Sequence, residues 1–132
     1  MNHDNPYFLE VIDTHVLIRQ WLGGESSDPQ VCAALLARFS PDYSMVGTGG
    51  QRLDFMKLSG FFRSAAGSRP GLEIGLSDLT LLQQSASGAV VAYRESQSLP
   101  GGDLTARLST VVFDRDGAGK LLWRHLHETW IA

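Results

Sequence analysis

Apolar side chains recur every three or four residues in the first half of the chain, and this spacing is typical of amphipathic helices. Three segments show it, over residues 6–22, 29–39 and 55–66. Each follows a residue that caps helix N-termini, namely Asn5, Asp28 (or Ser27) and Asp54. Gly23-Gly24 ends the first segment and Ser40-Pro41-Asp42 breaks the second. We therefore predict three helices.

The rest of the chain favours strands, because apolar and polar residues alternate and turn residues separate the alternating runs. We predict strands over residues 43–46, 72–81, 89–96, 104–113 and 121–131. The alternation changes phase between Leu76 and Leu79, which predicts a bulge near Ser77-Asp78. One short strand between helices, followed by four antiparallel strands, indicates an α+β domain with its helices on one face of a curved sheet.

Composition narrows the class of protein. The 132 residues include 43% apolar and 19% charged residues, which suits one globular domain over residues 1–132. The net charge of -3 comes without any basic run, so we expect neither nucleic acid nor a membrane as a partner. No apolar run has the length of a membrane span, the N-terminus does not resemble a signal peptide, and Cys32 is the single cysteine. We expect a cytoplasmic protein.

Three local patterns carry a resemblance to a known family. They are FSPDYSMVGTGGQRLDFMKL at 39–58, ARLSTVVF at 106–113 and LLWRHLHETWI at 121–131. With the element order, they resemble the nuclear-transport-factor-2-like superfamily, in particular its SnoaL-like and ketosteroid-isomerase-like bacterial branch. The resemblance implies a cone-shaped, cystatin-like fold, with three N-terminal helices packed on a strongly curved, mostly antiparallel sheet around a deep pocket. Its members include enzymes, binding proteins and association domains, so the fold does not settle the function.

Candidate site residues come from the expected pairing of the last three strands. If Val111 lies opposite Trp123, one sheet face collects most of the polar side chains of these strands. With Tyr43 from the first strand, the candidate ligand-binding residues are Tyr43, Tyr93, Glu95, Arg107, Ser109, Trp123, His125 and His127. The opposite assignment stays open, in which the Leu-rich face is the core and the histidine-bearing face is solvated or dimeric. A shift of one residue in one strand exchanges the faces of that strand.

The chemistry of these residues leaves alternatives open. His125 and His127 point the same way and, with Glu95, could approach a metal, but no acidic cluster supports this and we expect neither metal nor cofactor. Glu95 beside Arg107 is either a pocket acid or a structural ion pair. Tyr43 and Tyr93 are either oxyanion donors or core aromatics. His15, on the inner stripe of the first helix, is either a pocket group or a buried structural histidine.

Two functions follow. The first is a pocket that binds a small, mostly apolar organic molecule, with proton transfer or dehydration as the chemistry if the protein is an enzyme. The second is a non-catalytic association or ligand-sensing module, held together through a convex face around Leu108, Leu126 and Trp130. Both agree with a homodimer, and the sequence leaves open whether the protein is catalytic.

Overall fold

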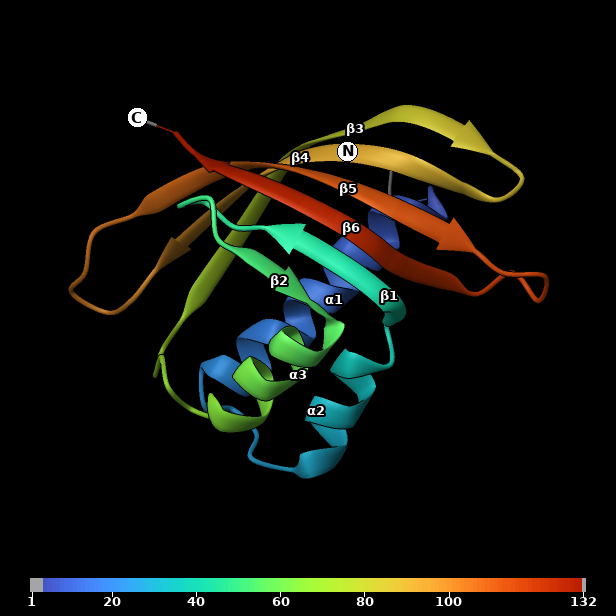
Figure 1. Cartoon of the computed structure of the whole chain (residues 1–132). Coiled ribbons are helices and arrows are strands. Elements are labelled where there is room, and N and C mark those ends of the chain that lie inside the picture. Colours follow the sequence, from blue (N-terminus) through green and yellow to red (C-terminus); the bar gives the residue numbers. More distant parts are fainter. Residues whose placement is uncertain (1–3, 132) are drawn as a thin grey trace.

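The computed structural model describes residues 4–131 and has helices below one side of a curved sheet (Figure 1). Within those residues there are three helices and six strands, in the order α1 Pro6–Leu22, α2 Pro29–Leu36, β1 Phe39–Val46, β2 Arg52–Asp54, α3 Phe55–Ser64, β3 Glu73–Ser85, β4 Gly88–Ser98, β5 Thr105–Arg115 and β6 Leu121–Trp130. The predicted α+β class and the curved, mostly antiparallel sheet are confirmed.

The sheet order is β2-β1-β6-β5-β4-β3, so the first strand and the last strand of the chain are neighbours. All neighbouring strands are antiparallel except β1 and β6, which are parallel. A parallel pair cannot be joined by a tight turn, and here α3 and the long β3–β4–β5 meander separate its members. The last strand therefore lies in the middle of the sheet, with β1 on one side and β5 on the other.

The helix caps agree with the sequence. The Asn5 side chain accepts hydrogen bonds from the first turn of α1, while Asp28 and Asp54 cap α2 and α3. Two helices are shorter than predicted, and α2 ends at Leu36 because the chain enters β1 at Phe39. Strand β2 was not predicted, because three residues after a glycine turn show no recognisable alternation.

The predicted bulge in β3 is confirmed. The pairing with β4 shifts between Ser77 and Thr80, and Asp78 takes a φ of 57°, a left-handed conformation that aspartate tolerates better than most residues. The extra residue reverses the alternation, so that apolar side chains on both sides of the bulge pack against the core.

A second bulge, in β6, overturns the predicted pairing of the last hairpin. Phe113 lies opposite Trp123 but Val112 lies opposite His125, so Arg124 is the additional residue. Val111 consequently faces Leu126, and the predicted pairing of Val111 with Trp123 is wrong. Past the bulge, the inner face of β6 carries Leu126 and Glu128, and the outer face carries His125 and His127.

An aromatic cluster fills the core between the helices and this sheet face. Trp123 is 1% exposed, and its ring lies 5.0 Å from that of Phe113 and 5.7 Å from that of Phe39. Phe39 in turn makes an edge-to-face contact with Tyr43 at 4.8 Å. These rings come from β1, β5 and β6, so they fix the parallel pairing and the bulge together.

Gly88 is the position where we expect the fold to tolerate least change. A Cβ added there would collide with the backbone carbonyl oxygen of Phe113 on the paired strand β5. Gly88→Ala should lower the free energy of unfolding by more than about 2 kcal/mol, as measured by urea denaturation. Gly117→Ala, in the next hairpin with open space around it, is the matched control and should change it by under about 0.5 kcal/mol. Equal effects of the two substitutions would contradict this reading.

Candidate functional site

A cavity of about 310 Å³ lies between the helices and the inner face of the sheet. Its walls are mostly apolar, and its polar groups come from α1, β4, β5, β6 and the segment after α3. The lining residues are Thr14, His15, Ile18, Leu22, Phe39, Tyr43, Met45, Leu53, Leu58, Phe61, Phe62, Arg69, Glu95, Gln97, Arg107, Trp123, Leu126 and Glu128. Apolar walls with a few convergent polar groups are typical of small-molecule sites.

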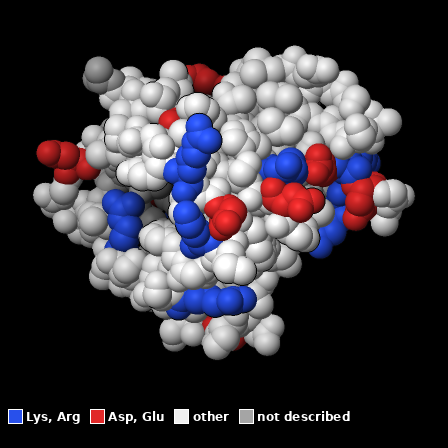
Figure 2. All heavy atoms as spheres, viewed as in Figure 1, with Lys and Arg blue, Asp and Glu red and all other residues white. Residues whose placement is uncertain are grey.

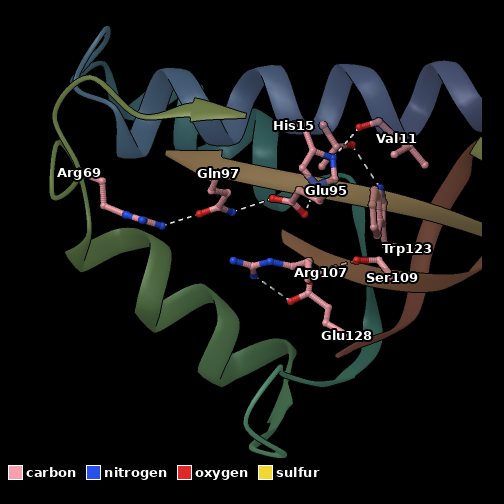
Figure 3. Close-up of polar contacts among 10 residues, drawn as sticks. Val11, His15, Arg69, Glu95, Gln97, Arg107, Ser109, Trp123 and Glu128 are labelled. Atoms are coloured by element: carbon pink, nitrogen blue, oxygen red, sulfur yellow. Dashed lines mark hydrogen bonds and ion pairs between the residues drawn. The ribbon is translucent and has the colours of Figure 1, made fainter. Parts of the chain in front are cut away.

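A buried ion pair joins the first helix to the sheet beside this cavity (Figure 3). The Nε2 atom of His15 lies 3.1 Å from Glu95 Oε1, and the two side chains are 7% and 4% exposed. The other ring nitrogen, Nδ1, lies 2.7 Å from the carbonyl oxygen of Val11 one turn earlier in α1. The imidazole is therefore held at both ends.

The partners of His15 define its protonation. A backbone carbonyl can only accept a hydrogen bond, so Nδ1 carries a proton, and an ionised Glu95 likewise requires a proton on Nε2. Burial favours the neutral form of His15, but the Glu95 carboxylate and the Val11 carbonyl outweigh it and raise the pKa. Burial also opposes charge on Glu95, yet His15 and Gln97 lower its pKa to about 2. The pair is imidazolium and carboxylate.

The second oxygen of Glu95 is also occupied. Gln97 Nε2 donates to Glu95 Oε2 at 2.6 Å, and Arg69 Nη1 donates to Gln97 Oε1 at 2.5 Å. Because the guanidinium has only donors, the Gln97 amide must turn its NH₂ group toward Glu95. Arg69, Gln97, Glu95 and His15 form one chain of hydrogen bonds from the segment after α3 to α1 (Figure 3).

A second carboxylate, Glu128, faces the same cavity with weaker contacts. Arg107 Nη1 lies 3.4 Å from Glu128 Oε1, and Ser109 Oγ lies 3.3 Å from Glu128 Oε2. Burial and the negative charge of Glu95 raise the pKa of Glu128, against the opposing effect of Arg107. The two carboxylates therefore differ in chemistry, because Glu95 is held ionised and Glu128 takes up a proton more readily.

The cavity also reaches a polar corner under Trp123. The indole Nε1 donates to Thr14 Oγ1 at 3.2 Å and to Glu10 Oε2 at 3.3 Å. Arg38 pairs with the same Glu10 carboxylate at 3.0 Å. These bonds satisfy the only polar atom of a large buried ring and anchor β6 to α1.

The structure brings half of the sequence-predicted site residues to the cavity. Tyr43, Glu95, Arg107 and Trp123 line it. Two further predicted residues, Tyr93 and Ser109, lie on the same face of the sheet but are buried behind the cavity lining. Burial, followed by the charges of nearby carboxylates, raises the pKa of both tyrosines, so they are neutral hydroxyls. The predicted closeness of Glu95 to Arg107 is confirmed, since they are directly paired across β4 and β5.

His125 and His127 must be removed from the predicted cavity set. The bulge at Arg124 turns both to the outer face of the sheet, where His127 is exposed and His125 Nδ1 lies 2.7 Å from Ser44 Oγ. Burial, together with the positive charges of His127 and Arg124, lowers the pKa of His125. The sheet also separates both histidines from Glu95, so these three residues do not meet at one metal position.

Sequence reasoning missed four polar residues of the cavity, namely Thr14, Arg69, Gln97 and Glu128. Strict alternation from Trp123 places Glu128 on the opposite face, and the extra residue at the bulge brings it to the cavity. Gln97 lies one alternation step beyond Glu95 on β4, which a longer predicted strand would have included. Arg69 lies in an irregular segment whose path no periodicity describes. His15 carried a visible signal, since it lay on the inner stripe of the first helix.

Two searches of the described residues limit the chemistry of the site. Between residues 4 and 131 no group of three or more His, Cys, Asp and Glu side chains is arranged to hold a metal ion. None of the helices in that range is sufficiently long and apolar to cross a membrane. On the face seen in Figure 2, basic and acidic side chains are intermixed among uncharged ones.

The three helices and the curved sheet form an α+β cone, and solved structures share this fold. An NTF-2-like protein of unknown function from Pseudomonas aeruginosa is 47% identical, with 96% of this chain and 98% of that chain covered at a TM-score of 0.90. A ketosteroid isomerase candidate from Parabacteroides distasonis is 14% identical, with 88% and 83% covered at 0.64. The CaMKII hub of S. rosetta is 16% identical, with 93% and 95% covered at 0.66.

The chain belongs to the NTF2-like family. The identity to the Pseudomonas protein over nearly the whole of both chains establishes this membership, and the two more distant structures share the fold alone. No protein-family model and no curated protein matches the chain.

The His15–Glu95 pair predicts a defined pH dependence of stability. The pKa of Glu95 falls on folding from 4.5 to about 2, so its contribution is present above pH 4.5 and is lost as the pH falls toward 2. The pKa of His15 rises above 6.5, so its contribution is present below pH 6.5 and is lost as the pH rises through the folded-state value. Glu95→Gln should lower the free energy of unfolding by about 3 kcal/mol, because it leaves a buried cation unpaired.

This loss, measured by urea denaturation across pH, should be largest between pH 4.5 and 6.5. The matched control is Glu25→Gln, which removes an exposed pair with Arg19 at 3.6 Å and should cost under about 1 kcal/mol. A pH-independent loss for Glu95→Gln would show that the contribution comes from packing and not from charge.

Proposed function

We propose that this protein binds a small, mainly apolar organic molecule in the cavity between its helices and sheet. The observation that carries the proposal is the contrast between apolar walls and one polar end, where His15, Glu95, Arg107 and Glu128 converge from four different elements. Burying several ionisable groups costs stability that an apolar core would not lose. Such a cost is typical of binding sites.

The polar end supports proton transfer or dehydration as the chemistry, if the protein is an enzyme. Glu95 accepts from both His15 and Gln97 and is a poor base in this arrangement. Glu128 has longer contacts and a raised pKa, so its carboxyl takes up and returns a proton more readily than that of Glu95. Tyr43, a neutral hydroxyl lining the same cavity, is suited to donate to a developing oxyanion. The existence of a ketosteroid isomerase candidate with this fold supports proton transfer as the chemistry of this site.

We place this activity in the cytoplasm, because Cys32 is a free buried thiol and single cysteines are common in reducing compartments.

Filling the cavity should abolish binding. We expect 4-phenylbutan-2-one, a neutral ketone of suitable size, to raise the melting temperature of the protein. Leu58→Trp places an indole into the cavity from α3 and should weaken the affinity at least tenfold by calorimetry, since the probe and the ring compete for the same space. Leu82→Trp, at a side chain that is 57% exposed on β3, is the matched control and should bind normally.

Overpacking can also unfold a protein, so the thermal unfolding of Leu58→Trp must be recorded without the probe. If the folded variant binds the ketone as well as the wild type does, the probe occupies some other place and the cavity proposal fails.

A second function, self-association as a homodimer, is favoured by the outer face of the sheet. Val90 and Val112 are paired there across β4 and β5, and Leu108 is 51% exposed on the same face. The sequence-based version of this face must be corrected, because Leu126 lines the cavity and Trp130 lies over the guanidinium of Arg107 on the inner side. The CaMKII hub and the association domain of C. elegans CaMKII have the same fold.

Leu108→Asp should convert the homodimer to a monomer, because it places an uncompensated charge in the apolar interface. Size-exclusion chromatography with light scattering measures the mass directly. Met56→Asp, at a side chain that is 81% exposed on the helical side, is the control and should leave the dimer intact. A wild-type protein that is monomeric at high concentration would end this second proposal.

A further inference from the structure

The charges that line the cavity do not balance. His15 offsets Glu95, and Arg107 offsets Glu128, each within one ion pair. Arg69 lines the same cavity and is bonded to the neutral Gln97 amide. With both glutamates ionised, the cavity therefore holds one positive charge more than it holds negative charges.

Arg107 has unused hydrogen-bonding capacity inside the cavity. Its Nη1 atom contacts Glu128, but its Nε atom is buried and has no partner among the described residues. Buried guanidinium donors without an acceptor are uncommon and call for an explanation. The side chain is only 15% exposed, and the ring of Trp130 covers one face of the guanidinium at 4.8 Å.

The position of the free donor indicates which ligand group it suits. Glu128 engages Nη1, and within residues 4–131 no hydrogen bond uses the edge formed by Nε and Nη2. Two parallel N–H groups on one guanidinium edge match the two oxygens of a carboxylate. In Figure 3 the Arg107 guanidinium extends toward that of Arg69, which approaches from the segment after α3.

We infer that the ligand is an amphipathic monocarboxylic acid, whose carboxylate binds the free Nε–Nη2 edge of Arg107 and whose hydrocarbon body lies against the apolar wall. The inference rests on the proposed binding function and specifies its ligand class. One carboxylate neutralises the excess charge, and Arg69 supplies the long-range attraction. The apolar lining of the cavity includes Ile18, Leu22, Leu53, Leu58, Phe61 and Phe62.

A neutral ligand would fit the cavity less well. An amide or ketone oxygen could accept from Arg107, but the excess positive charge would stay uncompensated in a mostly apolar surrounding. A dianion would meet Glu95 and Glu128, whose negative charges already lie at the same end of the cavity. The balance of charges therefore favours a single acidic group.

The test compares two probes of nearly equal shape, 4-phenylbutanoate and 4-phenylbutanamide, by isothermal titration calorimetry on the full chain. The acid should bind the wild type at least tenfold more tightly than the amide. Arg107→Gln should remove this preference for the acid. Arg107→Lys should keep part of the preference, because an ammonium retains the positive charge but cannot bind a carboxylate through two parallel N–H groups. Arg115→Gln, on an exposed arginine outside the cavity, is the matched control and should keep the full preference.

Removing Arg107 leaves Glu128 without its cation, so Arg107→Gln could fold poorly. The double variant Arg107→Gln/Glu128→Gln replaces the ion pair with a neutral pair, and it should fold while still lacking the preference for the acid. Equal binding of acid and amide by the wild type would overturn the ligand class and leave the binding function standing. A preference that survives in the folded double variant would overturn the role of Arg107. Binding of neither probe would count against both proposals.

Discussion

The buried pair of His15 and Glu95 is the interaction on which the site depends. It joins α1 to β4, and both ring nitrogens of His15 and both carboxylate oxygens of Glu95 are hydrogen-bonded. A charge pair in this position must keep its geometry, since either partner alone would be an uncompensated buried ion. The pair therefore fixes how far the first helix lies from β4, and this separation leaves room for the cavity next to it.

The bulge at Arg124 is the second constraint, because it decides what β6 presents to the interior. The strand begins with Trp123 packed against Phe113 and, after one extra residue, continues with Leu126 and Glu128 on the same side. Without this irregularity, the inner face would carry two histidines in place of a leucine and a glutamate. The acidic partner of Arg107 therefore exists through a local break in alternation.

The two inner carboxylates show how placement separates the properties of identical groups. Glu95 is bonded to an imidazolium and an amide, and these partners hold its pKa at about 2 despite burial. Glu128 has only distant contacts with Arg107 and Ser109, and its pKa is raised by burial and by Glu95. The cavity therefore has one carboxylate that is held ionised and a second that takes up a proton more readily.

The sequence by itself determined most of the local structure. Caps at Asn5, Asp28 and Asp54, the helical spacing after them and the phase change before Asp78 are all signals between near neighbours in the chain. The tertiary structure alone decided which faces meet. The parallel contact of β1 with β6, the bulge enforced by the rings around Trp123 and the approach of Arg69 to Gln97 join residues far apart in the chain. Such contacts depend on how side chains pack in three dimensions, and no periodicity along one strand encodes that packing.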